Sequence, residues 1–329
     1  MGSSSIVPEA DLRTFTEHLK RSRRILALLG AGLSAASGLP TFRGAGGLWR
    51  RHGAIDLASE EAFMAHPDLV WQFYSYRRHM ALLAKPNKAH YALAELAKRN
   101  RNFITLTQNV DGLSQRAGHP KSQLYELHGS LFTVKCTGLF CRHVAENEFT
   151  DPIVPALALP RAGTQPEPVE DDKTGEKAAE LLTQALNSSA PVLSKPLLNP
   201  GELDISDPNV PLPKIPQEEL PRCPKCEGLL RPGVVWFGEA LPEDVLETVD
   251  KWIEQPETID LILVVGTSAA VFPAALYIDT ARGKGAKVAV INMDKSHMPR
   301  SGLKPGDWFF EGDASAILPE ILKPAIGEI

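Results

Sequence analysis

Four short runs of apolar residues limit the possible folds more than any other feature of this sequence. Each run ends where glycine, serine, threonine, asparagine or glutamine begins, and the runs are Ile25–Leu29, Phe103–Leu106, Leu261–Val265 and Val288–Ile291. Uninterrupted apolar runs of this length are typical of strands buried on both faces, as in a parallel sheet covered by helices. A fifth run, Trp308–Phe310, is a candidate for a last strand. Because ligands of open α/β sheets bind at the carboxyl ends of the strands, the polar residues there predict a binding site.

Composition and charge narrow the class of protein. The 329 residues are 43% hydrophobic and 23% charged, as is typical of a soluble globular chain. The net charge of −5 argues against a chain held on nucleic acid or anionic lipid mainly by bulk charge. The N-terminus has no apolar signal core, and the longest uncharged run, Leu261–Ile278, is broken by Gly266 and Pro273. We therefore expect an intracellular protein without a membrane partner, cytoplasmic or nuclear, with a mitochondrial location left open.

The four cysteines form two close pairs, Cys136 with Cys141 and Cys223 with Cys226. Four cysteines in so long a chain do not resemble a secreted disulfide framework. Four thiolates are enough for a closed tetrahedral zinc site, and they leave no coordination position for water. We therefore predict a structural zinc ion, with four buried free thiols as the alternative.

The stretch between the cysteine pairs is rich in proline. Residues Pro152–Pro221 hold 13 of the 27 prolines, and no aromatic residue occurs between Thr150 and Val235. Such a segment is poor in the large side chains that build a core. We predict an exposed, flexible insertion over about residues 156–218, carried by the zinc lobe.

A glycine-rich turn follows the first apolar run. Residues Gly30 to Ala35 fit the pattern G-x-G-x-x-A, in which glycines allow the backbone to approach a pyrophosphate at a helix start. An ordinary tight turn between a strand and a helix explains the same glycines. The loop that follows carries Phe42 and Arg43, and we expect it to fold over a dinucleotide, with the arginine near phosphate.

Amide, carboxylate and imidazole side chains follow the second run. Gln108, Asn109 and Asp111 come directly after it, and His128 follows shortly afterwards. Amides can hold a ribose or a carboxamide, and a histidine titrates near neutral pH. The cluster favours His128 as a general base over a purely structural histidine.

Together these motifs resemble the sirtuins, which are NAD-dependent protein lysine deacylases. The resemblance covers residues 21–322 and includes Gly30-Ala31-Gly32-Leu33-Ser34, Gly38–Arg43, Thr107–Asp111, Leu127-His128-Gly129, the cysteine pairs, Val234–Glu239, Gly266-Thr267-Ser268 and Asn292. It implies an α/β fold: a Rossmann-like parallel sheet with helices on both faces, plus a small inserted zinc-binding lobe. It implies that an N-terminal extension with a first helix (1–20) precedes an NAD-binding domain (21–130 and 236–329). The zinc lobe would then span 131–235, with substrate in the cleft between the two.

The resemblance also implies a role for each site residue. His128 would be the general base for transfer of the acyl group to ADP-ribose, with Asn109 as the second catalytic residue. The residues expected to contact NAD are Gly30, Ala31, Gly32, Ser34, Thr41, Phe42, Arg43, Trp49, Gln108, Asn109, Asp111, Gly266, Thr267, Ser268, Asn292 and Ala314. Those expected to pair with an acyl-lysine peptide or protein are Val235, Phe237, Gly238 and Glu239. The implied cofactors are NAD and structural zinc, with no direct nucleic-acid partner.

Within the family the chain is most similar to the class III branch, which removes succinyl, malonyl and glutaryl groups. The pair Tyr74 and Arg77 matches that branch, and Ala58 matches a small residue that widens its acyl pocket. Residues three apart share a helix face, so both side chains can point into one pocket, and a phenol with a guanidinium suits a carboxylate there. A solvent-exposed arginine on an amphipathic helix is the alternative for Arg77.

Several functions remain open at this point. A deacetylase of broader acyl range, or an ADP-ribosyltransferase or NAD sensor on the same fold, fits the motifs. A hydride-transferring dehydrogenase would share the glycine turn but does not need four cysteines, and a zinc-ribbon nucleic-acid module conflicts with the acidic charge. Two departures from the family pattern are the x4 spacing of the first cysteine pair and Gly312-Asp313-Ala314, which leaves the adenine contact of Ala314 open.

Overall fold

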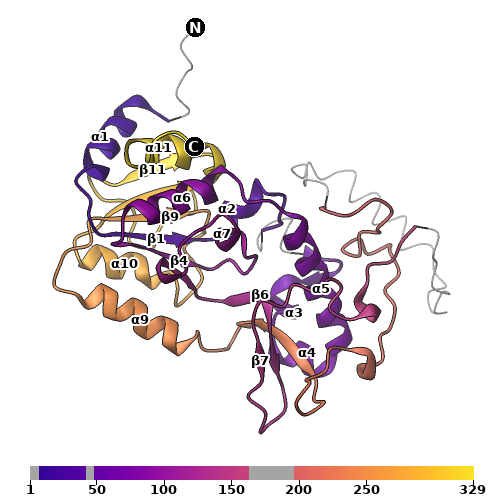
Figure 1. Cartoon of the computed structure of the whole chain (residues 1–329). Coiled ribbons are helices and arrows are strands. Elements are labelled where there is room, and N and C mark those ends of the chain that lie inside the picture. The colour runs from indigo at the N-terminus through magenta and orange to yellow at the C-terminus, as the bar shows by residue number, and fades with distance from the viewer. Residues whose placement is uncertain (1–6, 42–47, 163–195) are drawn as a thin grey trace.

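A six-stranded parallel sheet forms the larger part of the molecule (Figure 1). The computed structural model describes residues 7–41, 48–162 and 196–329. The sheet order is β11-β10-β9-β1-β4-β5, and the strands are β1 (Ile25–Leu29), β4 (Phe103–Thr107), β5 (Leu124–Glu126), β9 (Leu261–Val265), β10 (Lys287–Asn292) and β11 (Trp308–Glu311). Each neighbouring pair is parallel. The predicted α/β fold with a Rossmann-like parallel sheet is therefore confirmed, and all five apolar runs are strands.

Helices cover both faces of this sheet because its strands are apolar on both. In β1, Ile25, Ala27 and Leu29 enter one hydrophobic core, whereas Leu26 and Leu28 enter the other. Helices on the first face are α1 (Glu9–Leu19), α6 (Lys88–Arg99) and α11 (Ala314–Ile326), and those on the second are α9 (Glu243–Glu254) and α10 (Leu276–Gly283). Figure 1 shows α9 and α10 on the side of the sheet opposite α1 and α11. Two short helices, α2 (Gly32–Ala35) and α7 (Leu113–Arg116), follow β1 and β4.

A smaller lobe packs beside the sheet around a core of its own. Its antiparallel strands are β6 (Gly129–Cys136), β7 (Val144–Ala145) and β8 (Leu230–Val234), and its helices are α3 (Ala54–Leu57), α4 (Glu60–Ala65) and α5 (Pro67–Leu83). A short hairpin pairs β2 (Leu48–Trp49) with β3 (His52–Gly53). Most of α5 is buried, and Trp71 and Phe73 share one core with Phe132 of β6. The predicted division assigned residues 48–83 to the NAD-binding domain, whereas their side chains pack with the zinc lobe.

The segments that border residues 163–195, namely residues 150–162 and 196–221, also pack on this lobe; we call them the flanks of the proline-rich insertion, although they extend a few residues beyond its predicted range of 156–218. They contain the single-turn helices η3 (Pro155–Leu157) and η4 (Gln217–Glu219); a third such turn, η2 (Lys121–Gln123), precedes β5. Leu157, Ile205, Ile215 and Leu220 are buried in the lobe's core. Most residues of these flanks are exposed or partly exposed, but these aliphatic side chains anchor them in the core, which the prediction of an exposed insertion did not include. Residues 163–195 lie outside the described part of the chain.

Within the three described ranges, no helix is long and apolar enough to cross a bilayer.

Candidate active site

Two glycine-containing turns meet at the carboxyl ends of β1 and β9. The Gly32 N–H donates to the Gly266 carbonyl at 2.8 Å, and the Gly30 N–H donates to the Val265 carbonyl at 2.9 Å. A Cβ at Gly32 would lie 2.7 Å from Gly266 Cα, and one at Gly30 would lie 2.6 Å from Thr267 Cβ. Neither position accepts a side chain, because the two turns pack closely against each other; the approach of a pyrophosphate to the glycines stays a prediction.

A cavity of about 830 Å³ lies between these strand ends and the smaller lobe. Most of the predicted site residues line it: Gly30, Ala31, Gly32, Thr41, Ala58, Tyr74, Gln108, Asn109, His128, Val235, Phe237, Gly238, Glu239, Gly266, Thr267, Ser268, Asn292 and Ala314. The cavity is large enough for a dinucleotide together with part of a peptide. Ala314, whose contact with adenine the sequence leaves undecided, is among the lining residues.

A smaller cavity of about 30 Å³ adjoins the large one, since Ala31 and Asn109 line both. Ser34, Arg77 and Asp111 line the smaller cavity rather than the larger one. The Asp111 carboxylate accepts a hydrogen bond from Ser34 Oγ at 2.6 Å and another from the Leu113 N–H at 2.9 Å. These bonds fix the carboxylate beside a pocket of the size of a few atoms.

Amide side chains connect the strand ends around the large cavity. Asn109 Nδ2 donates to the Gly30 carbonyl at 3.0 Å, and Gln108 Nε2 donates to Thr267 Oγ1 at 3.1 Å. Asn292 Nδ2 donates to the Thr267 carbonyl at 2.8 Å. Because each amide uses its NH₂ group on the protein, its orientation is set before any ligand binds.

His128 has the geometry of a general base. Its Nδ1 lies 3.1 Å from the Gln108 carbonyl, which can only accept, so Nδ1 carries the proton and Nε2 is left as the acceptor. Burial lowers the pKa of His128, although the hydrogen bond to that carbonyl acts in the opposite direction. The imidazole is therefore neutral near pH 7 and able to take a proton.

Tyr74 and Arg77 on α5 line adjoining cavities, not the single pocket that their spacing predicted. Tyr74 Oη accepts a hydrogen bond from Trp236 Nε1 at 3.1 Å, which leaves the phenol proton available to the large cavity. Burial raises the pKa of Tyr74 to about 12, so the phenol stays a donor at neutral pH. Burial lowers the pKa of Arg77, while Tyr74 and Asp111 raise it. Arg77 is half-buried and so does not match the solvent-exposed alternative.

The segment after β8, predicted to pair with a peptide, lines the large cavity. The Val235 N–H donates to the His128 carbonyl and the Phe237 N–H to the Ala58 carbonyl, both at 2.9 Å. The Glu239 carboxylate accepts from Arg231 and from the Trp236 N–H, so it braces this segment from within. Phe237, in contrast, is about half exposed.

Three predicted NAD contacts are not placed in either cavity. Trp49 is buried in the smaller lobe against Phe73, with ring centroids 5.5 Å apart. Phe42 and Arg43 lie outside the described residues. Conversely, the sequence reasoning missed several lining residues that follow β9 and β10, namely Val271, Phe272, Pro273, Met293, Asp294 and His297. Their position just after strand ends was the available signal.

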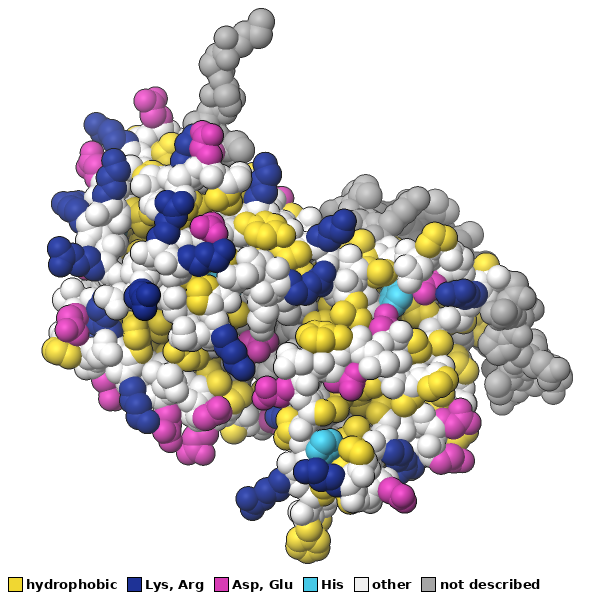
Figure 2. Space-filling model, in the orientation of Figure 1, with side chains coloured by type: hydrophobic (Ala, Val, Ile, Leu, Met, Phe, Trp, Pro, Cys, Tyr) yellow, Lys and Arg dark blue, Asp and Glu magenta, His cyan; other side chains and the backbone are white. Residues whose placement is uncertain are grey.

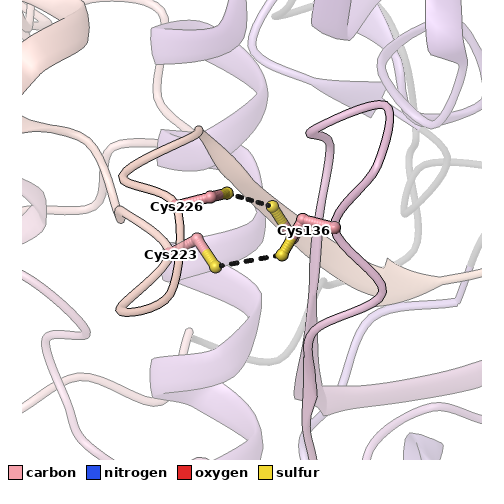
Figure 3. Close-up of side chains that lie close together, drawn as sticks. Cys136, Cys223 and Cys226 are labelled. Carbon is pink, nitrogen blue, oxygen red and sulfur yellow. Dashed lines mark hydrogen bonds between the residues drawn. The ribbon is translucent and has the colours of Figure 1, made fainter.

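The four cysteines gather in the smaller lobe, brought together from the ends of β6 and β8 (Figure 3). All four Sγ atoms lie within 4.8 Å of one another, with Cys136 to Cys226 at 3.4 Å and Cys141 to Cys223 at 3.7 Å. A tetrahedral zinc ion with Zn–S bonds of about 2.3 Å requires S–S separations of roughly 3.8 Å. The thiolates therefore fit a closed structural zinc site, and the separations are too long for disulfides.

Comparison with known proteins places these features in one family. The Sir2 family matches residues 30–172 and 203–273. An NAD-dependent protein deacylase of Candida albicans is 46% identical over 97% of this chain and 99% of its own length. The NAD-dependent protein deacylase sirtuin-5, mitochondrial, of Danio rerio is 39% identical over 96% of this chain and 88% of its own length.

Solved structures give the same result. A Sir2 homologue in complex with NAD is 33% identical, with a TM-score of 0.64, and covers 98% of this chain and 95% of its own. A Sir2 homologue in complex with 2′-O-acetyl ADP ribose is 34% identical, with a TM-score of 0.66, and covers 96% of this chain and 95% of its own. The shared sequence, the glycine turns, the half-buried histidine and the four-cysteine cluster lead to one conclusion: the chain belongs to the Sir2 family.

Proposed function

We propose that this Sir2-family NAD-dependent protein deacylase removes acidic acyl groups, of the succinyl, malonyl or glutaryl type, from lysine side chains. The products would be nicotinamide, 2′-O-acyl-ADP-ribose and free lysine. One observation carries the acyl preference: the buried phenol of Tyr74 and the half-buried Arg77 line adjoining cavities, and His128 lines the larger of the two. An acetyl group ends in a methyl group that cannot accept from these donors, whereas a terminal carboxylate would accept from both.

The size of the site agrees with this proposal. Ala58 lines the large cavity and is buried at its wall, so a longer acyl chain meets a methyl group there rather than a large side chain. The Phe63 ring packs against the Trp236 ring in a tilted arrangement with centroids 5.2 Å apart, and Trp236 Nε1 donates a hydrogen bond to Tyr74. The acyl end of the cavity is thus built from rigid, tightly packed groups, as selective binding requires.

The residues of this chain divide the chemistry between them. When NAD is bound, it supplies the ribose carbon that accepts the acyl oxygen and the nicotinamide leaving group. Asn109 and Asp111 would hold the ribose and the carboxamide, and the glycine turns would leave room for the phosphates. His128, with Nε2 unprotonated, would take a proton from a ribose hydroxyl during transfer of the acyl group.

The test is an NAD-dependent deacylation panel on one peptide carrying acetyl-, malonyl-, succinyl-, glutaryl- or crotonyl-lysine. We expect the acidic acyl groups to be removed at least tenfold faster, by kcat/KM, than acetyl. Replacing one partner of a buried charge pair costs about 2–5 kcal/mol, so Arg77→Met should reduce kcat/KM on succinyl-lysine about 30-fold or more. Acetyl-lysine turnover should remain.

A matched control is Arg13→Met, which removes an exposed arginine from α1, far along the chain from the cavities. It should leave every rate unchanged. Equal wild-type rates on acetyl and succinyl peptides would refute the acidic preference and leave a deacetylase of broader range.

A further inference from the structure

Helix α5 has a second polar face, turned away from the acyl cavities. At about 100° per residue, Tyr74 and Arg77 project from one side of the helix, and Gln72, Tyr76 and His79 project from the other. The second face is buried, although its side chains are polar. Apart from the Asp68 carbonyl of the same helix, which accepts from Gln72, its hydrogen-bond partners come from the flanks of the proline-rich insertion.

His79 makes the central contact on this face. Its Nδ1 lies 2.6 Å from a carboxylate oxygen of Asp151, and its Nε2 lies 2.8 Å from one of Glu202. Carboxylates only accept, so both ring nitrogens carry protons and the imidazole is a cation. Asp151 belongs to the incoming flank and Glu202 to the returning one. The two ends of the insertion are therefore joined through one side chain of α5.

Three further hydrogen bonds repeat the pattern along the helix. Tyr76 Oη donates to Asp204 Oδ1 at 2.7 Å, Ser75 Oγ donates to the Leu157 carbonyl at 3.3 Å, and Gln72 Nε2 donates to the Pro213 carbonyl at 3.3 Å. We call these four side chains with their insertion partners the α5 clasp. It covers two turns of the helix, and those same turns carry Tyr74 and Arg77.

The returning flank is itself anchored, so the clasp has a fixed base. The Arg50 guanidinium donates to the carbonyls of Ile205, Asp207, Val210 and Pro208 at 2.8–3.0 Å. Ile205 and Ile215 are buried in the lobe's core on either side of this anchor. A helix held by such a base cannot rotate or slide without breaking buried hydrogen bonds.

We propose that the α5 clasp, with His79 at its centre, positions Tyr74 and Arg77 and thereby sets the selectivity for acidic acyl groups. This proposal rests on the proposed function above. It assigns the flanks of the insertion the role of positioning Tyr74 and Arg77. His79 touches neither cavity and is a positioning residue. Because a misplacement of about 1 Å can cost 100-fold in rate, a loosened clasp weakens binding of the acyl carboxylate while the NAD side is unaffected.

Two variants test the clasp, His79→Leu and the isosteric Glu202→Gln, which keeps the shape of the contact if the leucine variant folds poorly. The matched control is His66→Gln, because His66 is an exposed histidine at the start of the same helix, whose side chain does not cap it. Steady-state kinetics are measured on succinyl- and acetyl-lysine forms of one peptide. Amide hydrogen exchange is followed in residues 71–80.

For both variants we expect KM for the succinyl peptide to rise about tenfold with kcat within threefold, and acetyl kcat/KM to stay within threefold. Exchange in residues 71–80 should become at least tenfold faster, and the control should match the wild type. A parallel loss on both peptides would reduce the clasp to a stability element and overturn the proposal, as would unchanged selectivity.

The wild-type ratio separates this proposal from the proposed function. If the wild type does not prefer the succinyl peptide, the proposed acyl preference fails. The rate of amide hydrogen exchange in residues 71–80 is then the only test of whether the clasp holds α5 in place. Faster exchange in residues 71–80 of the variants then supports the clasp, and unchanged exchange overturns it.

Discussion

The hydroxyl of Tyr74 accepts a hydrogen bond from Trp236 and would donate another to the acyl carboxylate of a substrate. Its removal should therefore produce two separable effects. Tyr74 and Trp236 are each 2% exposed, and the Trp236 Nε1–H donates to Tyr74 Oη at 3.1 Å. In Tyr74→Phe the ring remains, so no sizeable void opens, but the indole N–H loses its acceptor. An unsatisfied buried donor costs about 1–3 kcal/mol, and that is the expected loss of unfolding free energy.

The effect on catalysis has a different origin. The Tyr74 hydroxyl, which lines the large cavity, would donate to the acyl carboxylate, and a hydrogen bond to a charged group contributes about 1.5–3 kcal/mol. We therefore expect kcat/KM on succinyl-lysine to fall by ~10–150-fold, since about 1.4 kcal/mol corresponds to tenfold. Acetyl-lysine turnover should change by less than threefold, because an acetyl group has no carboxylate.

Urea unfolding measures the first effect, and steady-state kinetics on the two peptides measure the second. Tyr91→Phe is the control, because Tyr91 is an exposed tyrosine on α6 and should show neither effect. The reasoning is refuted if succinyl and acetyl activities fall by the same factor, since the loss would then come from the altered packing at Trp236 alone.

Three further predictions concern other parts of the molecule. His128→Ala should reduce deacylation by ~10²–10⁴-fold, and NAD binding measured by calorimetry should persist; near-normal turnover would remove His128 from the mechanism. Chelation of zinc should make four thiols titratable and lower Tm by ~5 °C or more, a result that four simple free thiols would not give. The hydrogen bond to Asp151 raises the pKa of His79, against burial, so the stability it adds is complete below about pH 6.5 and is lost as pH rises through the raised pKa. The difference in unfolding free energy between wild type and His79→Gln should accordingly be largest near pH 6 and shrink towards pH 9; a difference that grows with pH would show that the ion pair is not the cause.

Those parts of the fold that depend on local sequence were predictable. A strand buried on both faces needs an uninterrupted apolar run, and Leu261–Val265 has no other simple explanation beside the glycine turn that follows it. The cysteine cluster was predictable for a similar reason, because thiolate pairs close in sequence are pre-arranged for one metal ion. In contrast, β5 has only three residues and two of them are only partly buried, so it gave no such signal.

The remaining features depend on contacts between residues far apart in the chain. The sequence around Trp49 does not show that the indole packs on Phe73 rather than on a ligand. Helical spacing correctly put Tyr74 and Arg77 on one face, but the boundary between two cavities runs between them. The role of His79 could not be predicted either, since its two carboxylate partners are more than 70 and 120 positions away.

The separation of the hydrophobic cores bears on how such a protein can change over time. The two glycine turns rest on the two cores of the parallel sheet, whereas Tyr74, Ala58 and Trp236 belong to the core of the smaller lobe (Figure 2 shows the two bodies in outline). A substitution in one core therefore leaves the packing of the others intact. New acyl preferences can accumulate by mutation in the lobe without loss of the inherited nucleotide chemistry, and the two halves are free to diverge at different rates.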